Sequence, residues 1–390
     1  MKVKMDELRD AVNAVSATKS QVTMAVDDER KVGTFVSTDG QMGIKVMSRF
    51  PYSGSFDETD NMYMAAGLNE CVNVLAPYGD SVNISKSNKM IKLTTGQAKV
   101  NVGMLNEKPA DIAVGKKIAV YQVSGKEFLF AMGQTNYAPT INVIFKKDKM
   151  IVCALTDYRI TVVSIPVLQS DVPNFEDENL DEEMQSRVDA INDTTNFIVD
   201  EEREEFMTAI NREVWSKISS ICRDEYFCVY VYDNQLQFVW DKVAISLPVT
   251  PVVKGDPRFV RKLATESIKT ENSIEFSVNS KTLLDALNLA SISGELEINF
   301  RGDEGELEIY TLNGSAKIKA EGVTEFNQTY NGKHLKGILS INKNIDLNVV
   351  SEKELLIMDY SKEFEHCFDG DEPFKNNIDV HMLAIGKGSK

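Results

Sequence analysis

The sequence predicts an α+β protein in which helices cover one face of antiparallel sheets. A unit made of a short strand, a helix and about three further strands recurs along the 390 residues. Each helical stretch carries a single narrow apolar stripe, as a helix that lies on one face of a sheet requires. A turn followed by a strand occurs three times, at Ser37–Val46, Ala154–Val167 and Tyr310–Ala320.

Six helices are expected, each directly after a short alternating stretch. In the first, "MKVKMDELRDAVNAVS", Val3 and Met5 precede Leu8, Val12 and Val15. The other five repeat this order in the stretches "NMYMAAGLNECVNVL", "AVYQVSGKEFLFAM", "FMTAINREVWSKISSI", "IEFSVNSKTLLDALNLAS" and "TEFNQTYNGKHLKGIL". Ser124 and Ser280 stand at positions where a hydroxyl can cap a helix N-terminus.

Alternating strands with turn residues follow each predicted helix. The pairs Asp233-Asn234, Gly302-Asp303 and Asn313-Gly314 mark tight turns between such strands. Two units together have the size of one domain, and three pairs of units fill the chain. We therefore predict three domains, at 1–115, 116–265 and 266–390.

Most of the acidity of the chain lies in one segment. The net charge is −16, and the segment Asp171–Glu205 alone carries −12. A strongly acidic surface repels nucleic acid, but here the rest of the chain is close to neutral. We predict a solvated and partly disordered insertion at about 171–195. Its simplest interpretation is an exposed loop without a partner, and the alternative is a docking segment for a basic protein.

Composition argues against several classes of protein. No apolar run has the length of about 18 residues that a membrane span needs, and the N-terminus lacks the apolar core of a signal peptide. A cytoplasmic protein is therefore expected. The five cysteines are scattered, which favours reduced buried thiols over zinc ligands. We expect no metal, no cofactor and no enzyme activity, because no phosphate-binding loop, Cys-His pair or HExxH motif occurs.

The order and spacing of the units resemble those of a known family. The stretch "TNYAPTINVIFKKDKMIVCALTDYRITVVSIPV" is similar to the start of the middle domain of the bacterial DNA polymerase sliding clamp, the β clamp. The helical stretches from Phe206, Phe276 and Phe326 resemble later units of that family, and "NIDVHMLAIG" resembles its last strand. The resemblance covers nearly the whole chain.

The chain also departs from the family pattern. Tyr158 stands where the family has Gly-His, and Leu383-Ala384-Ile385 replaces a run similar to Met-Pro-Met. The acidic insertion and the tail "GKGSK" are additional features. These differences indicate a divergent member, such as one from a phage.

The resemblance implies a ring of two subunits joined head to tail, with helices inside and sheets outside. Such a ring encircles duplex DNA without reading its sequence and tethers the replicative polymerase, after a clamp loader has placed it. It also implies a cleft for short partner peptides between the second and third domains. The residues that would line this cleft are Thr156, Tyr158, Arg159, Ile160, Pro257, Arg261, Leu263, Met382, Leu383 and Ile385.

Contact with DNA phosphates needs cations on the helices that face the duplex. The candidates are Arg9, Lys19, Lys126, Arg212, Lys217, Lys281, Lys333 and Lys336. The helices carry about as many acids, so weak and mobile contact is expected. Ordinary solvated helix faces are the alternative interpretation of these cations.

Two further classes of protein remain open from the residues. One is a metal-dependent nucleic-acid enzyme that uses the acidic segment. The other is a structural or assembly protein built from repeated β-rich units. Metal-dependent hydrolysis would favour the first and high-order shells the second, whereas a two-fold ring that stimulates a polymerase would favour the clamp.

Overall fold

The structure is a computed structural model. It describes residues 1–56, 62–64, 67–87, 89–105, 114–156, 159–171, 198–200, 205–223, 225–248, 273–352, 355–366 and 374–385. The chain forms two compact units, the first made of residues 1–129, 167–204 and 213–251 and the second of residues 130–166, 205–212 and 252–390. No helix among the described residues is long and apolar enough to cross a membrane. The predicted acidic insertion at 171–195 lies outside the described residues, apart from Asp171.

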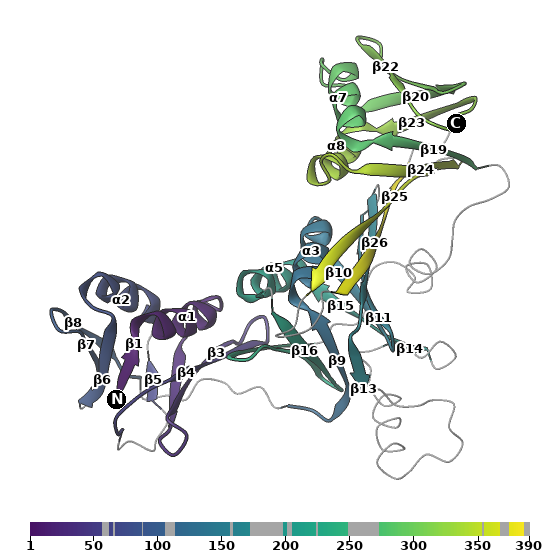
Figure 1. Ribbon diagram of the computed structural model, residues 1–390. Coiled ribbons are helices and arrows are strands. Elements are labelled where there is room, and N and C mark those ends of the chain that lie inside the picture. The colour runs from purple at the N-terminus through teal and green to yellow at the C-terminus, as the bar shows by residue number, and fades with distance from the viewer. Residues whose placement is uncertain are drawn as a thin grey trace, which may run out of the picture. The chain divides into compact units, whose positions relative to one another are not determined.

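The six predicted helices are confirmed (Figure 1). Within the described ranges the α-helices are α1 (Met5–Ser16), α2 (Leu68–Leu75), α3 (Gly125–Thr135), α5 (Arg212–Ile221), α7 (Ser280–Ala290) and α8 (Gly332–Ile341). One short strand leads into each helix: β1 (Lys2–Lys4), β5 (Met62–Met64), β9 (Lys117–Ser124), β15 (Glu205–Asn211), β19 (Ile274–Asn279) and β23 (Phe326–Asn331).

Three strands follow each helix, which completes the predicted repeat. In the first and second modules these are β2 (Val22–Asp27), β3 (Val32–Asp39) and β4 (Ile44–Pro51), then β6 (Ser81–Ser87), β7 (Met90–Thr94) and β8 (Lys99–Gly103), with η1 (Ala76–Tyr78) after α2. In the third and fourth they are β10 (Thr140–Lys146), β11 (Lys149–Leu155) and β12 (Arg159–Pro166), then β16 (Tyr226–Tyr232), β17 (Gln235–Val239) and β18 (Val243–Pro248). In the fifth and sixth they are β20 (Glu297–Asp303), β21 (Glu306–Tyr310) and β22 (Ser315–Lys319), then β24 (Asp346–Glu352), β25 (Leu355–His366) and β26 (Phe374–Ile385).

Modules are paired by an exchange of their first strands. Strand β1 of the first module lies beside β6 of the second, and β5 of the second lies beside β2 of the first. The same exchange places β9 beside β16 and β15 beside β10, then β19 beside β24 and β23 beside β20. A module therefore completes its sheet only with its partner module, which explains why the repeat comes in pairs. The three-domain boundaries themselves stay a prediction.

Two antiparallel pairings join these sheets into larger ones. Strand β4 pairs with β18, with Val46 opposite Ile245, and β12 pairs with β26, with Ile160 opposite Leu383. The resulting nine-stranded sheets have the orders β13-β9-β16-β17-β18-β4-β3-β2-β5 and β14-β15-β10-β11-β12-β26-β25-β24-β19, where β13 is Gln169–Asp171 and β14 is Ile198–Asp200. Two four-stranded sheets, β1-β6-β7-β8 and β22-β21-β20-β23, end in the edge strands β8 and β22.

The apolar stripes pack as the helix periodicity predicts. Leu8, Val12 and Val15 of α1 are buried, and α1 packs against α2 as α7 packs against α8. In the third and fourth modules Phe128 of α3 meets the edge of Trp215 of α5, with ring centroids 5.3 Å apart. Burial of these side chains removes apolar surface from water and holds each helix on its sheets.

One predicted helix cap is wrong by one residue. The Oδ1 of Asn279 accepts hydrogen bonds from the backbone N–H groups of Lys281 and Thr282, so Asn279 is the N-cap of α7. Ser280 is instead the first helical residue, and its Oγ accepts from the backbone N–H of Ile345 at 2.9 Å. Asn331 caps α8 in the same way, which the sequence reasoning missed. Ser124 is the last residue of β9, directly before α3.

Candidate functional site

The turn between β11 and β12 is held by Thr156. Its backbone N–H donates to the carbonyl oxygen of Arg159 at 2.8 Å, and its Oγ1 accepts from the backbone N–H of Arg159 at 3.2 Å. These two bonds fix the point at which β12 begins. The residues between them, Asp157 and Tyr158, lie outside the described residues, as do Pro257, Arg261 and Leu263.

The side chain of Arg159 is buried, and no acid among the described residues forms an ion pair with it. It is only 5% exposed, and its guanidinium carbon lies 3.8 Å from the centroid of the Tyr137 ring. Its Nε and Nη2 have no hydrogen-bond partner. Burial lowers the pKa of Arg159, and Tyr137 acts in the opposite direction. A cation–π contact compensates part of the lost hydration, but it does not satisfy the N–H donors.

Helix α8 forms the other wall around Arg159. A Cβ built on Gly337 would lie 3.7 Å from the Nη1 of Arg159, so the helix comes close where it has no side chain. His334 lies one turn earlier on α8. Burial, Lys333 and Arg159 together lower the pKa of His334, which favours its neutral form near pH 7.

The apolar residues predicted for the cleft are part of the sheet core. Ile160 lies opposite Leu383 and Thr161 opposite Met382 in the β12–β26 pairing. Ile160, Met382 and Leu383 are all buried, so none of them presents a side chain to solvent in this structure. Ile385 belongs to β26, but its side chain is outside the description. Arg159, Ile160, Met382 and Leu383 thus lie together in the β12–β26 pairing. Thr156 lies at the start of this pairing, where it binds the backbone of Arg159.

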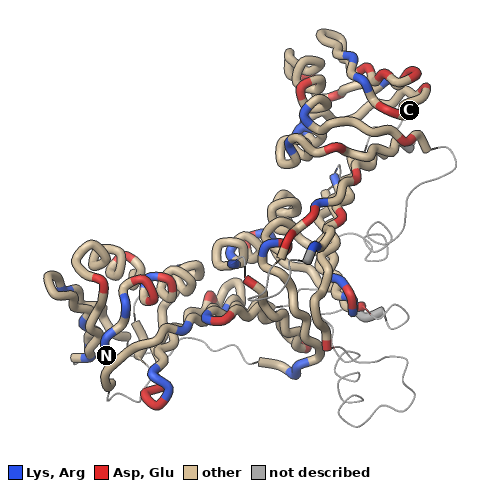
Figure 2. Tube along the Cα trace, viewed as in Figure 1, with Lys and Arg blue, Asp and Glu red and all other residues tan. Residues whose placement is uncertain are grey.

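The cations predicted to face DNA fall into two groups. Six are exposed: Arg9, Lys19, Lys126, Arg212, Lys281 and Lys333. Two are half-buried and engaged within the chain, because Lys217 binds Asp39 at 3.1 Å and Lys336 donates to the Oγ of Ser291. Exposed acids such as Asp6, Asp10 and Asp285 lie on the same helices, so both signs of charge occur along them (Figure 2).

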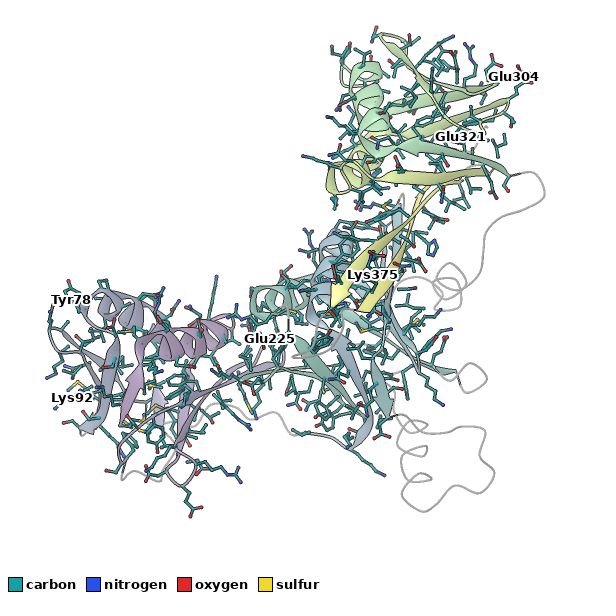
Figure 3. All side chains as sticks on the ribbon, viewed as in Figure 1. Tyr78, Lys92, Glu225, Glu304, Glu321 and Lys375 are labelled. Atoms are coloured by element: carbon teal, nitrogen blue, oxygen red, sulfur yellow. The ribbon has the colours of Figure 1, made fainter. Side chains whose placement is uncertain are left out.

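Exposed apolar side chains gather beside the two edge strands. In the first unit, Val74 lies on α2, which packs next to β8. Tyr78 lies on η1, directly after α2 (Figure 3). In the second unit, Leu289, Ile292 and Leu296 lie at and after the end of α7, and Leu312 is fully exposed in the turn before β22. The Oγ1 of Thr311 donates to the carbonyl oxygen of Ala290 at 2.6 Å and holds this turn against the helix. Sequence reasoning missed these residues because the patch forms only when turn and helix meet.

A polar cavity of about 230 Å³ lies in the first unit, between α1, β4 and the β17–β18 turn. Its walls include Arg49, Trp240 and Lys242. Lys242 binds Glu7 across it at 2.8 Å. The ionic lining distinguishes this cavity from the apolar peptide cleft that the family resemblance implies.

Comparison with known proteins places this geometry in one fold. No protein-family model and no curated protein sequence matches the chain. Among solved structures, the DNA polymerase sliding clamp of Bacillus subtilis is similar at a TM-score of 0.70 and 15% identity, over 100% of this chain and 99% of that one. The chain has the sliding-clamp fold.

Other solved sliding clamps agree over their whole length. The DNA polymerase III subunit beta of Pseudomonas aeruginosa is similar at a TM-score of 0.72 and 10% identity, with 100% of both chains covered. The beta subunit of Thermotoga maritima is similar at a TM-score of 0.70 and 10% identity, over 100% of this chain and 99% of that one. The predicted α+β class of three repeated domains is therefore confirmed as a sliding-clamp fold.

Proposed function

We propose that this protein is a DNA sliding clamp. In this role it forms a ring around duplex DNA, makes no sequence-specific contacts, and tethers the replicative DNA polymerase for processive synthesis. The observation that carries this proposal is the match to sliding clamps over 100% of this chain and 99% or 100% of the matched chains. The protein acts as a scaffold rather than as an enzyme, at replication forks in the cytoplasm of a bacterial or phage-infected cell.

The strand pairings support a head-to-tail homodimer. The last strand of the first module, β4, pairs with the last strand of the fourth, β18, and the last strand of the third, β12, pairs with that of the sixth, β26. By the same rule β22 of the fifth module should pair with the last strand of a module three places further on. Among the described residues β22 pairs only with β21. Strand β8 of the second module is the edge strand that would serve, in a second copy of the chain.

The composition of the two edges fits this pairing. Exposed edge strands normally need protection against such contacts, and lysines often supply it. On β22, however, Lys317 and Lys319 lie opposite Glu308 and Glu306 of β21, so their charges are balanced within the sheet. Leu312 beside β22 and Val74 beside β8 add exposed apolar surface at both edges. A contact that joins unlike surfaces closes into a ring when the rotation between copies allows it.

The exposed helix cations support weak contact with DNA. Arg9, Lys126, Arg212, Lys281 and Lys333 can each approach a phosphate, whereas neighbouring acids limit the total attraction. A ring gains its hold on DNA from topology, so it does not need a strongly basic lumen. The peptide cleft for polymerase and loader is proposed at the β12–β26 pairing, around Thr156 and Arg159.

Retention on DNA of different topology tests the proposal. The protein is loaded with the cognate clamp loader onto closed circular DNA and washed at high salt, and the circle is then cut. We expect a particle of twice the 43.6 kDa chain mass that stays on the circle and leaves after cutting. Loss from intact circles, or retention on linear DNA, would contradict a sliding ring. Divalent-metal-dependent hydrolysis of the DNA, or assembly into large shells, would instead support one of the two alternative classes.

A further inference from the structure

One position on a helix recurs in three modules, and a different type of residue occupies it each time. Each odd-numbered module presents a turn before its last strand, and in two cases this turn meets a helix three modules further on. The helix residue concerned lies between two buried residues: Lys217 lies between Trp215 and Ile218 on α5, and Gly337 lies between Leu335 and Ile338 on α8. Val74 holds the same place on α2, between Val72 and Leu75.

At the first of these places the charges are satisfied inside the chain. Asp39, the last residue of β3, forms an ion pair with Lys217, with Nζ and Oδ2 3.1 Å apart, and both side chains are largely buried. The Oδ1 of Asp39 also accepts from the backbone N–H groups of Gln41 and Met42, at 3.1 Å each. The pair closes this junction, because an ionic ligand would have to displace a partner already in place.

At the second place a buried cation, Arg159, forms no ion pair with any described residue. Gly337 replaces the lysine, and Arg159 extends from β12 to within contact of the helix. Its Nε and Nη2, which form one edge of the guanidinium, lack partners, whereas its face is covered by Tyr137. This edge is the one that a carboxylate binds through two parallel hydrogen bonds. A buried cation without a counter-ion is costly, so an anion that reaches it gains a strong interaction.

We propose that Arg159 is the receptor for a carboxylate of the docked partner peptide. This inference rests on the proposed function, because it names the chemistry that the peptide must carry. The carboxylate belongs either to an Asp or Glu side chain or to the free C-terminus of the partner, and both present the same two oxygens. The Asp39–Lys217 pair prevents the junction at α5 from binding the same ligand, so the part of the chain that the structure describes offers this site once.

Peptide binding with matched acids and amides tests the inference. Overlapping peptides tiled along the cognate polymerase are first screened for binding to the intact protein. The tightest binder is then compared with versions in which each Asp or Glu becomes Asn or Gln, and with a version whose C-terminus is amidated. We expect one of these changes to weaken binding by tenfold or more, and the change that does so identifies the source of the carboxylate.

Two variants connect that loss to Arg159. In Arg159→Met, which keeps the length of the side chain, the acid and amide peptides should bind within twofold of each other. Because Met needs no hydrogen-bond partner, this variant should also melt at the same or a higher temperature without peptide. In the matched control Asp39→Asn, which breaks the satisfied ion pair, peptide discrimination should be unchanged and the melting temperature lower.

The outcomes separate this inference from the proposed function. The inference is overturned if the amide peptides bind wild-type protein as tightly as the acids, or if Arg159→Met retains the full preference. In either case the protein can still bind a polymerase peptide and remain on circular DNA. If no polymerase peptide binds and the protein does not stay on circular DNA, the sliding-clamp proposal itself has failed.

Discussion

Single residues decide whether a repeated position is closed or available for binding. Lys217 and Gly337 occupy equivalent places on α5 and α8, yet one is engaged by Asp39 and the other leaves space beside Arg159. The difference lies in the side chains on the helix and on the facing strand end, because the surrounding strand pairings have the same antiparallel arrangement. The function of each junction therefore depends on which charges remain unpaired after folding.

Leu383 is a packing residue in this structure, which changes how the cleft should be tested. Its side chain is 1% exposed in a strand that pairs on both sides. We expect Leu383→Ala to lower the free energy of unfolding by about 2–5 kcal/mol, because it removes buried apolar atoms and leaves a cavity. Denaturant titration measures this change, and Ile341→Ala, at an exposed position, should have little effect. A loss below about 1 kcal/mol would show that the site repacks or is open to solvent.

His381 should make stability depend on pH. Its Nδ1 lies 3.0 Å from the Oδ1 of Asp359, and this hydrogen bond raises the pKa of His381 above its ordinary value of 6.5, with further attraction from Asp359 and Asp379. Burial and Lys149 act in the opposite direction. The stabilisation is therefore complete below the unfolded pKa and disappears as the pH rises through the folded pKa.

A histidine variant tests this dependence. We expect His381→Asn to be less stable than the parent at about pH 6 and to approach it at about pH 8.5, as measured by the free energy of unfolding across that range. A constant difference between the two proteins would mean that His381 contributes through packing rather than through its charge.

At the scale of elements, the exchange of first strands explains why modules come in pairs. The edges of the sheets explain where an inserted segment is tolerated. Strand β13 lies at the edge of one nine-stranded sheet and β14 at the edge of the other. The acidic segment connects these two edge strands along the chain. An addition at two sheet edges changes the length of a connection without changing the strand order.

Deletion of residues 172–195 tests this view. The deletion begins after Asp171 because that residue ends β13. We expect the free energy of unfolding to change by only about 1 kcal/mol, since loop closure depends weakly on length. Thermal unfolding, solution mass and processive synthesis should all resemble those of the parent. Unfolding or loss of the dimer would show that the segment is structural, whereas loss of one partner alone would show that it is a docking segment.

At the scale of the whole molecule, the proposed assembly depends on a surface that one chain leaves exposed. Leu312 is 100% exposed in the turn before the edge strand β22. In the two internal junctions, Asp39 at the end of β3 and Arg159 at the start of β12 each contact a helix of a later module. We therefore expect Leu312 to contact Val74 or its neighbours in a second copy.

Replacing Leu312 tests this contact without disturbing the core. We expect Leu312→Glu to shift the particle from dimer to monomer at micromolar concentration, because a buried charge without a partner opposes association. Light scattering measures the mass, and Ile341→Glu, at another exposed apolar position, should leave the dimer intact. A variant that remains fully dimeric would place the interface elsewhere.

The sequence by itself determined the module, because periodicity and turn residues are local properties. Apolar spacing located all six helices, and the turns at 37–46, 154–167 and 310–320 marked where last strands begin. The N-cap of α7 was missed by one residue because Asn and Ser cap equally well, and only backbone geometry distinguishes Asn279 from Ser280.

Only the tertiary structure decided which modules exchange strands, which charges are left without partners, and which apolar residues remain at the edges. The sequence presents Asp39, Lys217, Arg159 and Lys336 simply as charged residues in a turn, a strand or a helix. Folding pairs the first two, engages Lys336 with Ser291, and leaves Arg159 alone against Tyr137. These outcomes depend on contacts between residues far apart in the chain. The local sequence pattern carries no information about which distant side chain a residue will contact.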